Sequence, residues 1–179
     1  MSKVIWHVTM SLDGFIAGPD DEMDWAFEHT APSALADEVR ESTGAILAGR
    51  RWYDVATARY GGRSGIYGGA WSGPVFVLTH RPPEASNDPS LTFLSDGVRN
   101  AVATASTAAG EKSVGIFGAD IARQCLRGGH LDEIVVHLAP VLLGDGVRFH
   151  DSPGAPRVQL ERTALAESGQ LTDLRFTVL

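Results

Sequence analysis

Two places in the sequence combine a strand, a glycine and a helix in the way that phosphate-binding sites do. In the first, Val114 to Phe117 reads as a buried strand that runs through Gly118 into an amphipathic helix, which Gly128 and Gly129 end. Such a turn leaves backbone N–H groups and the positive end of the helix dipole beside open space, which suits a phosphate or pyrophosphate. The alternative is that Gly118 only permits a tight turn between strand and helix.

The second place is the short buried strand 45–48, which is followed by Gly49-Arg50-Arg51-Trp52 at the start of a helix. Arginines are unfavourable at a helix N-terminus, whose dipole end is already positive, and a bound phosphate would remove that conflict. Alternatively, both side chains reach solvent or nearby carboxylates. Thr79-His80-Arg81 follows a further buried strand, 75–78, at the sheet edge where open α/β folds bind ligands.

Composition limits what else the chain can do. Its 179 residues, 44% of them hydrophobic and 21% charged, predict a single globular domain over residues 1–179. A net charge of −7 argues against binding to nucleic acid or to an anionic membrane, so an anion must be held by local arginines and amides. One cysteine and six scattered histidines predict neither an internal disulfide nor a metal site. We expect neither a signal peptide nor a membrane span, and therefore a cytoplasmic protein.

Strand and helix patterns alternate along most of the chain. A first strand, 4–10, is followed by a helix over 32–43, the strands noted above, a strand over 91–94, and a helix that Ser95 or Asp96 caps and that ends at Ala109. After a strand over 133–138, two strands over 158–166 and 171–179 form a hairpin. This order predicts an α/β fold with a mixed, mostly parallel sheet, flanking helices and a C-terminal antiparallel hairpin.

Two loops carry residues of interest. Residues 58–74 contain six glycines together with Tyr60, Tyr67 and Trp71, which favours a flap over a site. In the loop after the first strand, Asp13-Gly14 is a turn signal, so Asp13 can simply bond its own loop backbone. Trp25 either closes a pocket or fills the core.

Four stretches in this order resemble the dihydrofolate reductase-like superfamily, most nearly the C-terminal reductase domain of the riboflavin-biosynthesis deaminase-reductases and its stand-alone bacterial relatives. They are Met10 to Gly18, Gly49 to Tyr53, Phe117 to Leu126, and Leu131 to Phe149. The resemblance implies an NADPH-dependent reductase on an eight-stranded sheet, a homodimer with a small-molecule substrate. It also implies that the Phe117-Gly118 peptide bond is cis, because dihydrofolate reductases have a cis bond at this place.

The resemblance also implies where the cofactor NADP binds. Gly49, Arg50, Arg51 and Trp52 would bind its phosphates, and the turn from Phe117 and Gly118 through Ala119, Asp120, Ile121 and Ala122 would hold its pyrophosphate. The segment Thr79, His80 and Arg81 would lie near the adenosine ribose. Val8, Thr9, Ile16 and the turn Gly144, Asp145 and Gly146 would flank the nicotinamide. Arg51 and Arg81, with His80, are the cations that would select NADPH over NADH.

The residues expected near the substrate differ from those of dihydrofolate reductases and from those of riboflavin-pathway reductases. Dihydrofolate reductases carry an acid a few residues after the loop tryptophan, where this chain has only Glu28, out of register. Riboflavin-pathway reductases carry lysine where His7 stands and glutamate where Ile116 stands. Proton donors are therefore predicted in the order Asp24, Asp13, His7 and Glu28, the histidine because it titrates near neutrality.

Two functions follow from this pattern. The first is hydride transfer from NADPH to a pteridine-like, ribosylaminopyrimidine-like or flavin-like ring. The second is a non-catalytic nucleotide-binding protein on the same fold, which the missing acid favours.

Overall fold

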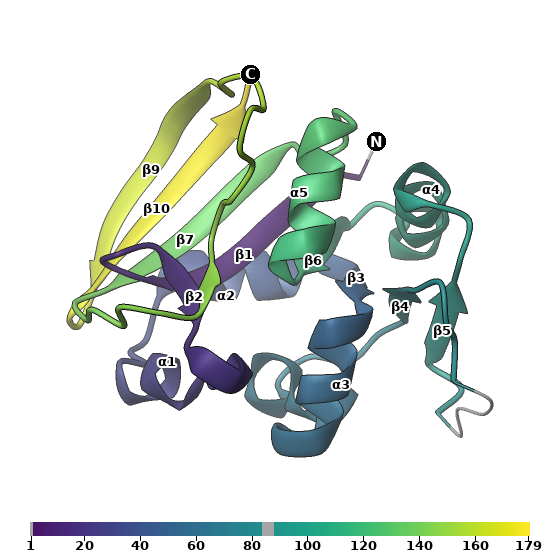
Figure 1. The fold of residues 1–179 in the computed structure, drawn as a ribbon, viewed down its shortest axis with the longest axis horizontal. Coiled ribbons are helices and arrows are strands. Elements are labelled where there is room, and N and C mark those ends of the chain that lie inside the picture. Colours follow the sequence, from purple (N-terminus) through teal and green to yellow (C-terminus); the bar gives the residue numbers. More distant parts are fainter. Residues whose placement is uncertain (1, 84–87) are drawn as a thin grey trace.

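The computed structural model describes residues 2–83 and 88–179, and an eight-stranded sheet forms its centre (Figure 1). The strand order is β5-β4-β3-β6-β1-β7-β10-β9. The first six strands in this order run parallel, and β10 and β9 are antiparallel to their neighbours, as the sequence predicts. The strands are β1 (Val4–Ser11), β3 (Thr43–Gly49), β4 (Val75–Leu78), β5 (Leu91–Leu94), β6 (Ser113–Phe117), β7 (Glu133–Ala139), β9 (Leu160–Ser168) and β10 (Leu171–Val178).

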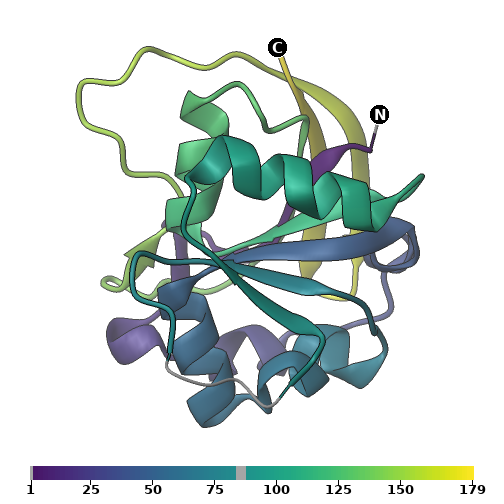
Figure 2. The same cartoon turned by 90° about the vertical axis from the view of Figure 1, so that its right-hand side faces the viewer.

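Helices cover both faces of the sheet, as Figure 2 shows from the side. One face carries α4 (Val98–Ala109) and α5 (Ala119–Arg127), and the other carries α2 (Ala34–Ser42), α3 (Arg50–Arg59) and the 3₁₀ helix η2 (Gly62–Gly69). The short elements η1 (Pro19–Asp21) and α1 (Asp24–Glu28) follow the small strand β2 (Phe15–Ala17), which pairs with β8 (Val147–Arg148). Parallel strands covered on both sides explain their nearly continuous apolar sequences.

Side chains alternate between two cores because successive residues of a strand point to opposite faces. In β1, Val4 and Trp6 pack with α4 and α5, whereas Ile5 packs with Leu35 and Val39 of α2. Since the strand has period two, His7 shares the face of Ile5. The polar side chain of His7 therefore lies on a covered face of the sheet.

Several element boundaries differ from those predicted. The second helix begins at Ala34, because Ser33 caps it by accepting a hydrogen bond from the Ala36 N–H. Gly97, with a φ of +84°, precedes α4, so neither Ser95 nor Asp96 caps that helix. Residues 15–17, expected in a loop, form β2. The interval 58–74, expected to be irregular, contains η2.

Trp25 and Trp71 both lie in the core. The sequence left the place of Trp25 open and predicted Trp71 in a flap. Trp25 packs with Ala139 and Leu171, so it fills the core. Trp71, expected in a flap, is buried, and its indole N–H donates to the Thr43 carbonyl. Of the three aromatic residues of that interval, Tyr60 and Tyr67 line the pocket described below and Trp71 does not.

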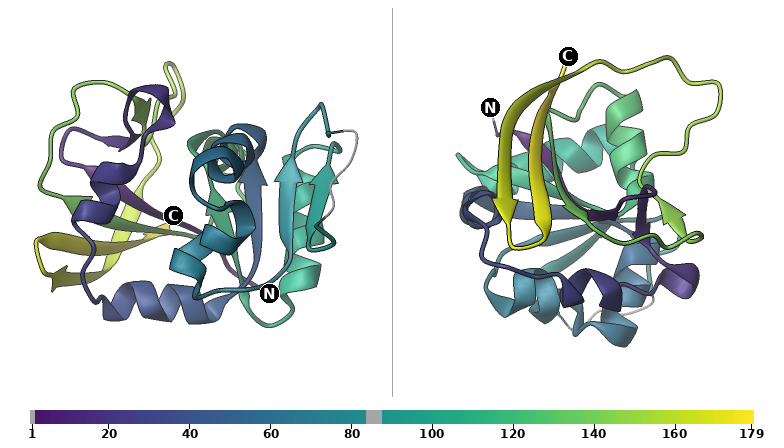
Figure 3. Two further views of the ribbon diagram at one scale, coloured as in Figure 1. Left: turned by 90° about the horizontal axis from the view of Figure 1, so that it is seen from below. Right: turned by 90° about the vertical axis from the view of Figure 1, so that its left-hand side faces the viewer.

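The hairpin of β9 and β10 forms one edge of the sheet, and in the right-hand view of Figure 3 no helix lies in front of it. In the described part of the chain, no helix is long and apolar enough to cross a membrane.

Candidate functional site

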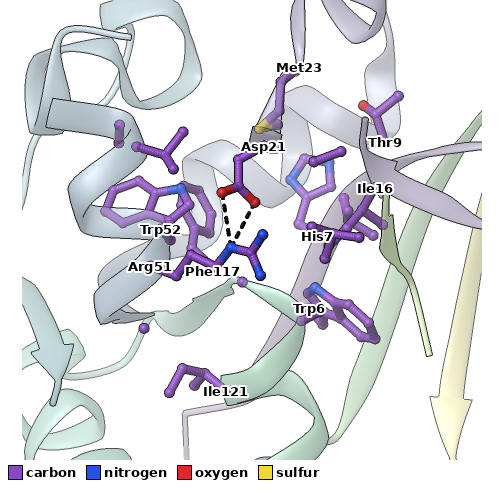
Figure 4. A pocket seen from close by; sticks show the side chains of 18 of the residues that line it. Trp6, His7, Thr9, Ile16, Asp21, Met23, Arg51, Trp52, Phe117 and Ile121 are labelled. Atoms are coloured by element: carbon purple, nitrogen blue, oxygen red, sulfur yellow. Dashed lines mark hydrogen bonds and ion pairs between the residues drawn. The ribbon is translucent and has the colours of Figure 1, made fainter. Parts of the chain in front are cut away.

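A pocket of about 1080 Å³ opens at the carboxyl ends of β3, β6 and β1 (Figure 4). The start of α3, the start of α5, η2 and the loop after β1 supply most of its walls. Fifteen of the residues predicted to bind the cofactor line it: Val8, Thr9, Ile16, Gly49, Arg50, Arg51, Trp52, Thr79, His80, Phe117, Gly118, Ala119, Asp120, Ile121 and Gly146. The pocket also exceeds the 300–1,000 Å³ usual for a single small ligand, so it has room for two.

Two helix N-termini face this pocket from neighbouring strands. The strands β3 and β6 are parallel and paired, with Ala48 opposite Phe117, so α3 and α5 begin side by side. No described side chain caps either helix through a hydrogen bond, which leaves their first N–H groups available. An anion placed here would face the positive ends of two helix dipoles.

The turn into α5 differs from the predicted one. None of the described peptide bonds is cis, so the prediction of a cis bond between Phe117 and Gly118 is wrong. Gly118 instead adopts a φ of +98° and a ψ of 135°, which a glycine reaches without the steric cost that a Cβ would bring. An added Cβ would lie 3.6 Å from the Trp52 Cβ, in ordinary van der Waals contact, so the positive φ is what favours glycine at this position.

The two arginines at the start of α3 are already paired. Arg51 Nε lies 2.8 Å from a carboxylate oxygen of Asp21, an ion pair that lies between Trp52 and His7 in the view of Figure 4. Arg50 pairs with Asp54 at 2.8 Å, and it also donates to the carbonyl of Arg81. The Arg51 side chain is 71% exposed, so a phosphate can compete with Asp21 for it.

Four predicted cofactor residues are not among those that line the pocket. Arg81 is exposed, and it contributes its carbonyl to Arg50. Ala122 is completely buried on the core side of α5. Gly144 donates its N–H to the Asp13 carboxylate at 2.7 Å, and Asp145 accepts from the Gly146 N–H.

The carboxylate of Asp13 holds two loops together and does not line the pocket. It accepts from the Ser11 hydroxyl at 2.6 Å and from the N–H groups of Leu143 and Gly144. The bond from Ser11, followed by those from the two amides, outweighs burial and lowers the pKa of Asp13 to about 2. Asp13 is therefore ionised at neutral pH, a poor state for a proton donor.

The other two predicted carboxylates also lie away from the pocket wall. Asp24 is exposed and accepts from the Tyr60 hydroxyl at 3.2 Å, while Glu28 is exposed at the end of α1. Of the four predicted proton donors, the structure brings only His7 into the pocket.

His7 is part of a buried hydrogen-bonded chain. Its Nδ1 lies 3.0 Å from the Tyr67 hydroxyl, and its Nε2 lies 2.6 Å from His137 Nε2. Burial, followed by the nearby His137 and Arg175, lowers the pKa of His7 from 6.5 to about 3, against an opposing effect of Asp173. The prediction that His7 titrates near neutrality is therefore wrong, because desolvation disfavours the charged form of its ring.

The last group of this hydrogen-bonded series is a buried carboxylate. His137 Nδ1 lies 2.6 Å from Asp173, whose other oxygen accepts from Ser33 and Ser168 at 2.6 Å each. Burial raises the pKa of Asp173, but these hydrogen bonds outweigh it and hold that pKa below its usual value. Asp173 thus stays ionised with no exposed surface.

The comparisons with known proteins agree with this architecture. A family model described as the RibD C-terminal domain matches residues 2–172. The chain belongs to the RibD C-terminal domain family. In an alignment of 184 positions that covers 97% of each chain, it is 24% identical to the uncharacterized protein YwjB of Bacillus subtilis strain 168.

Solved structures share the fold of this RibD C-terminal domain. A Shewanella sp. PV-4 protein named for riboflavin biosynthesis matches with a TM-score of 0.80 and 20% identity, over all of this chain and 99% of the other. The Thermotoga maritima deaminase/reductase matches with a TM-score of 0.68 and 18% identity, over 99% of this chain and 57% of the other. Rib7, the riboflavin biosynthesis reductase of Saccharomyces cerevisiae, matches with a TM-score of 0.62 and 13% identity, over 99% and 89%.

Sequence reasoning missed His137 and Asp173 and used Tyr67 only as a flap residue. A weak signal existed, because both missed residues interrupt apolar strands, in Val135-Val136-His137-Leu138 and in Leu171-Thr172-Asp173-Leu174. A polar residue at such a position needs a partner, but the pattern does not say which one. Asp21, the partner of Arg51, carried no signal beyond its charge.

Proposed function

We propose that this RibD C-terminal domain is an NADPH-dependent reductase of a small ring compound of pteridine, ribosylaminopyrimidine or flavin type. The observation that carries the proposal is the union, in one pocket, of two uncapped helix N-termini with Arg51 at one end and a hydrogen-bonded histidine chain at the other. The first end suits a dinucleotide phosphate, and the second suits a polar ring. When bound, NADPH would supply the hydride.

The residues present fit that cofactor. The N–H groups that begin α3 and α5 would hold its phosphates, and Gly118, which has no side chain of its own, would let a pyrophosphate approach the backbone. Thr79 and His80, beyond the end of β4, line the same side of the pocket. Val8, Thr9 and Ile16 line the same pocket.

NADPH oxidation, followed by absorbance with ring compounds of the three classes, tests the proposal. We expect Arg51→Ala to weaken NADPH binding about tenfold or more and NADH binding hardly at all, since a charge-assisted bond to the 2′-phosphate contributes roughly 1.5–3 kcal/mol. Asp21→Asn, which releases the guanidinium from its ion pair, should act in the opposite direction. Arg81→Ala should have the smaller effect of the two arginine variants, because its side chain does not line the pocket.

Arg59→Ala, at the exposed last turn of α3, is the matched charge control. Equal loss of both cofactors in Arg51→Ala would show that this arginine does not read the 2′-phosphate. Binding of NADPH without oxidation by any ring compound would favour the second candidate, a non-catalytic nucleotide-binding protein. That candidate draws its support from the position of Asp13, Asp24 and Glu28 outside the pocket wall.

A second copy of the chain is the proposed partner. Leu165 of β9 is 58% exposed and lies opposite Leu174 of β10, on the face that Phe176 shares. We expect Leu165→Arg to shift the protein from dimer to monomer in analytical ultracentrifugation, because the charge would be buried between two apolar faces. Ala166→Arg, at the next position of the same strand and therefore on the other face of the sheet, is the control for added charge. A wild-type monomer at all concentrations would contradict this proposal.

A further inference from the structure

A continuous chain of hydrogen-bonding groups leads from the pocket into the sheet, and phosphate binding makes no use of it. His7 of β1, His137 of β7 and Asp173 of β10 lie on one face of three neighbouring strands. Asp173 pairs directly with His137 in the register, and His7 lies diagonally across from His137. Tyr67 of η2 joins the chain at the pocket end.

Building on the reductase function proposed above, we propose that the Tyr67 hydroxyl donates the proton that the reduced ring requires, and that His7, His137 and Asp173 replace this proton. Tyr67 is the catalytic residue in this proposal, because its hydroxyl would touch the substrate. The two histidines and Asp173 are positioning and proton-transfer residues. Ser33 and Ser168 orient the carboxylate at the far end.

The hydrogen-bond distances determine the resting arrangement of protons. The ionised Asp173 can only accept, so His137 Nδ1 carries a proton. With a neutral His137, its Nε2 accepts from the Nε2–H of His7, and His7 Nδ1 then accepts from the Tyr67 hydroxyl. In this state Tyr67 directs its proton toward His7 and has none to offer the substrate.

One additional proton reverses the direction in which each of these hydrogen bonds is donated. His137 then carries protons on both nitrogens beside the Asp173 carboxylate, and it donates from Nε2 to His7 Nε2. His7 donates from Nδ1 to the Tyr67 oxygen, which frees the Tyr67 O–H to point into the pocket. This loaded state places the positive charge next to the buried carboxylate, where it is best compensated.

The proton transfer is balanced in atoms and charge. The hydride that bound NADPH would supply adds to the carbon of a C=N bond, so the ring is reduced and the cofactor is oxidised to NADP⁺, while the ring nitrogen takes the Tyr67 proton. A C–H and an N–H bond form, and the cofactor C–H bond, the Tyr67 O–H bond and the C=N π bond break. The Tyr67 oxygen takes the Nδ1 proton of His7, and His7 Nε2 takes a proton from His137. The chain returns to its resting state, and one proton from solvent reloads it.

The backbone of Tyr67 supports a special role. Tyr67 has a φ of +49° and a ψ of 39°, a left-handed conformation that is unfavourable for a non-glycine residue. Its ring packs edge-on against Phe117 at 5.9 Å and lies 5.5 Å from the His7 ring. The strained conformation thus directs the hydroxyl at the histidine chain.

Other charged groups near the chain belong to defined pairs. Arg175 of β10 bonds Glu38 at 2.9 Å and lies 3.7 Å from Glu133, and its charge opposes protonation of His7. Burial raises the pKa of Tyr67 to about 12, and it outweighs the opposing effects of the Thr43 side chain and of Arg40 on α2. Tyr67 therefore stays protonated at neutral pH, and it can give up its proton only when His7 resupplies one.

The first test compares Tyr67→Phe with Tyr53→Phe. Tyr53 packs against Phe93 outside the pocket, so its variant controls for loss of a phenol hydroxyl. We expect Tyr67→Phe to lower kcat about 100-fold while the Kd for NADPH changes less than twofold, in line with the usual contribution of a general acid. The kcat of wild type should fall as pH rises, because the loaded state needs the additional proton, and this dependence should disappear in Tyr67→Phe.

The second test uses Ser168→Ala, a small change that keeps the fold when a replacement of Asp173 would not. Losing one donor makes the Asp173 carboxylate attract the His137 proton more strongly, so the pH profile of kcat should move to higher pH. A merely structural serine would lower stability without moving the profile. In the protein without cofactor, ring ¹⁵N spectra should place the additional proton on His137 and not on His7, and Ser168→Ala should shift this titration in the same direction.

The outcomes separate the two proposals. Normal turnover with an unchanged pH profile in Tyr67→Phe overturns the proton chain and leaves the reductase function standing. A wild type that oxidises no NADPH with any ring compound overturns the reductase function and the chain's part in it. Ring spectra that place the proton on His7, or that do not respond to Ser168→Ala, overturn the chain without reference to activity.

Discussion

Replacing Gly146 with alanine is expected to destabilise the folded protein by about 3 kcal/mol, the sum of backbone strain and steric overlap. A Cβ at this position would lie 2.1 Å from the Ala17 carbonyl oxygen and 2.8 Å from the Gly18 backbone. Neither contact is with a flexible side chain, so the backbone itself must move. Gly146 also has a φ of +134°, which side chains rarely adopt. Urea unfolding followed by tryptophan fluorescence measures the loss.

Gly144→Ala is the matched control, two residues away in the same turn. Gly144 has a φ of +76°, but a Cβ there would meet no described atom within 4 Å, so only strain of about 1 kcal/mol is expected. Equal losses in the two variants would show that the overlap with β2 is relieved at no cost. Because Gly146 lines the pocket and β2 carries Ile16, the Gly146 variant should also weaken cofactor binding.

Acid is expected to destabilise the protein through His7. Its pKa is about 3 in the folded protein and 6.5 in the unfolded chain, so between these values the unfolded state binds the additional proton. Stability therefore rises with pH across this window and is lost as pH falls, by up to about 1.4 kcal/mol for each pH unit. Thermal or urea unfolding between pH 4.5 and 6.5 measures the slope.

His7→Asn should reduce this slope, because asparagine does not titrate. The range stops at pH 4.5 because Asp13, with a pKa of about 2 against a usual 3.8, adds its own acid dependence below pH 4. His150→Asn, which removes an exposed histidine, is the control and should keep the wild-type slope. An unchanged slope in His7→Asn would mean that His7 is not held neutral in the folded protein.

The two turns at which we propose that phosphate binds were predictable from the sequence because their signals are local. At Gly49 and at Gly118, a buried strand, a glycine and a helix follow one another within about ten residues, and this order alone directs N–H groups into open space. The alternation of strands and helices likewise predicted the parallel sheet and the terminal hairpin. Each of these features depends on neighbours in the chain, so a pattern can reveal it.

Only the tertiary structure decided which residues form the proposed proton-transfer series. His7, His137 and Asp173 are separated by 130 and 36 residues, and their contact depends on strand order and register. No local pattern distinguishes a histidine on a covered strand face that is neutral from one that is charged, because the difference lies in burial and in partners from other strands. For the same reason Asp13 resembled a proton donor until its bonds to Leu143 and Gly144 were known. The fold and the two strand-glycine-helix turns could be predicted from the sequence by itself, whereas long-range packing determined which polar side chains meet at the pocket.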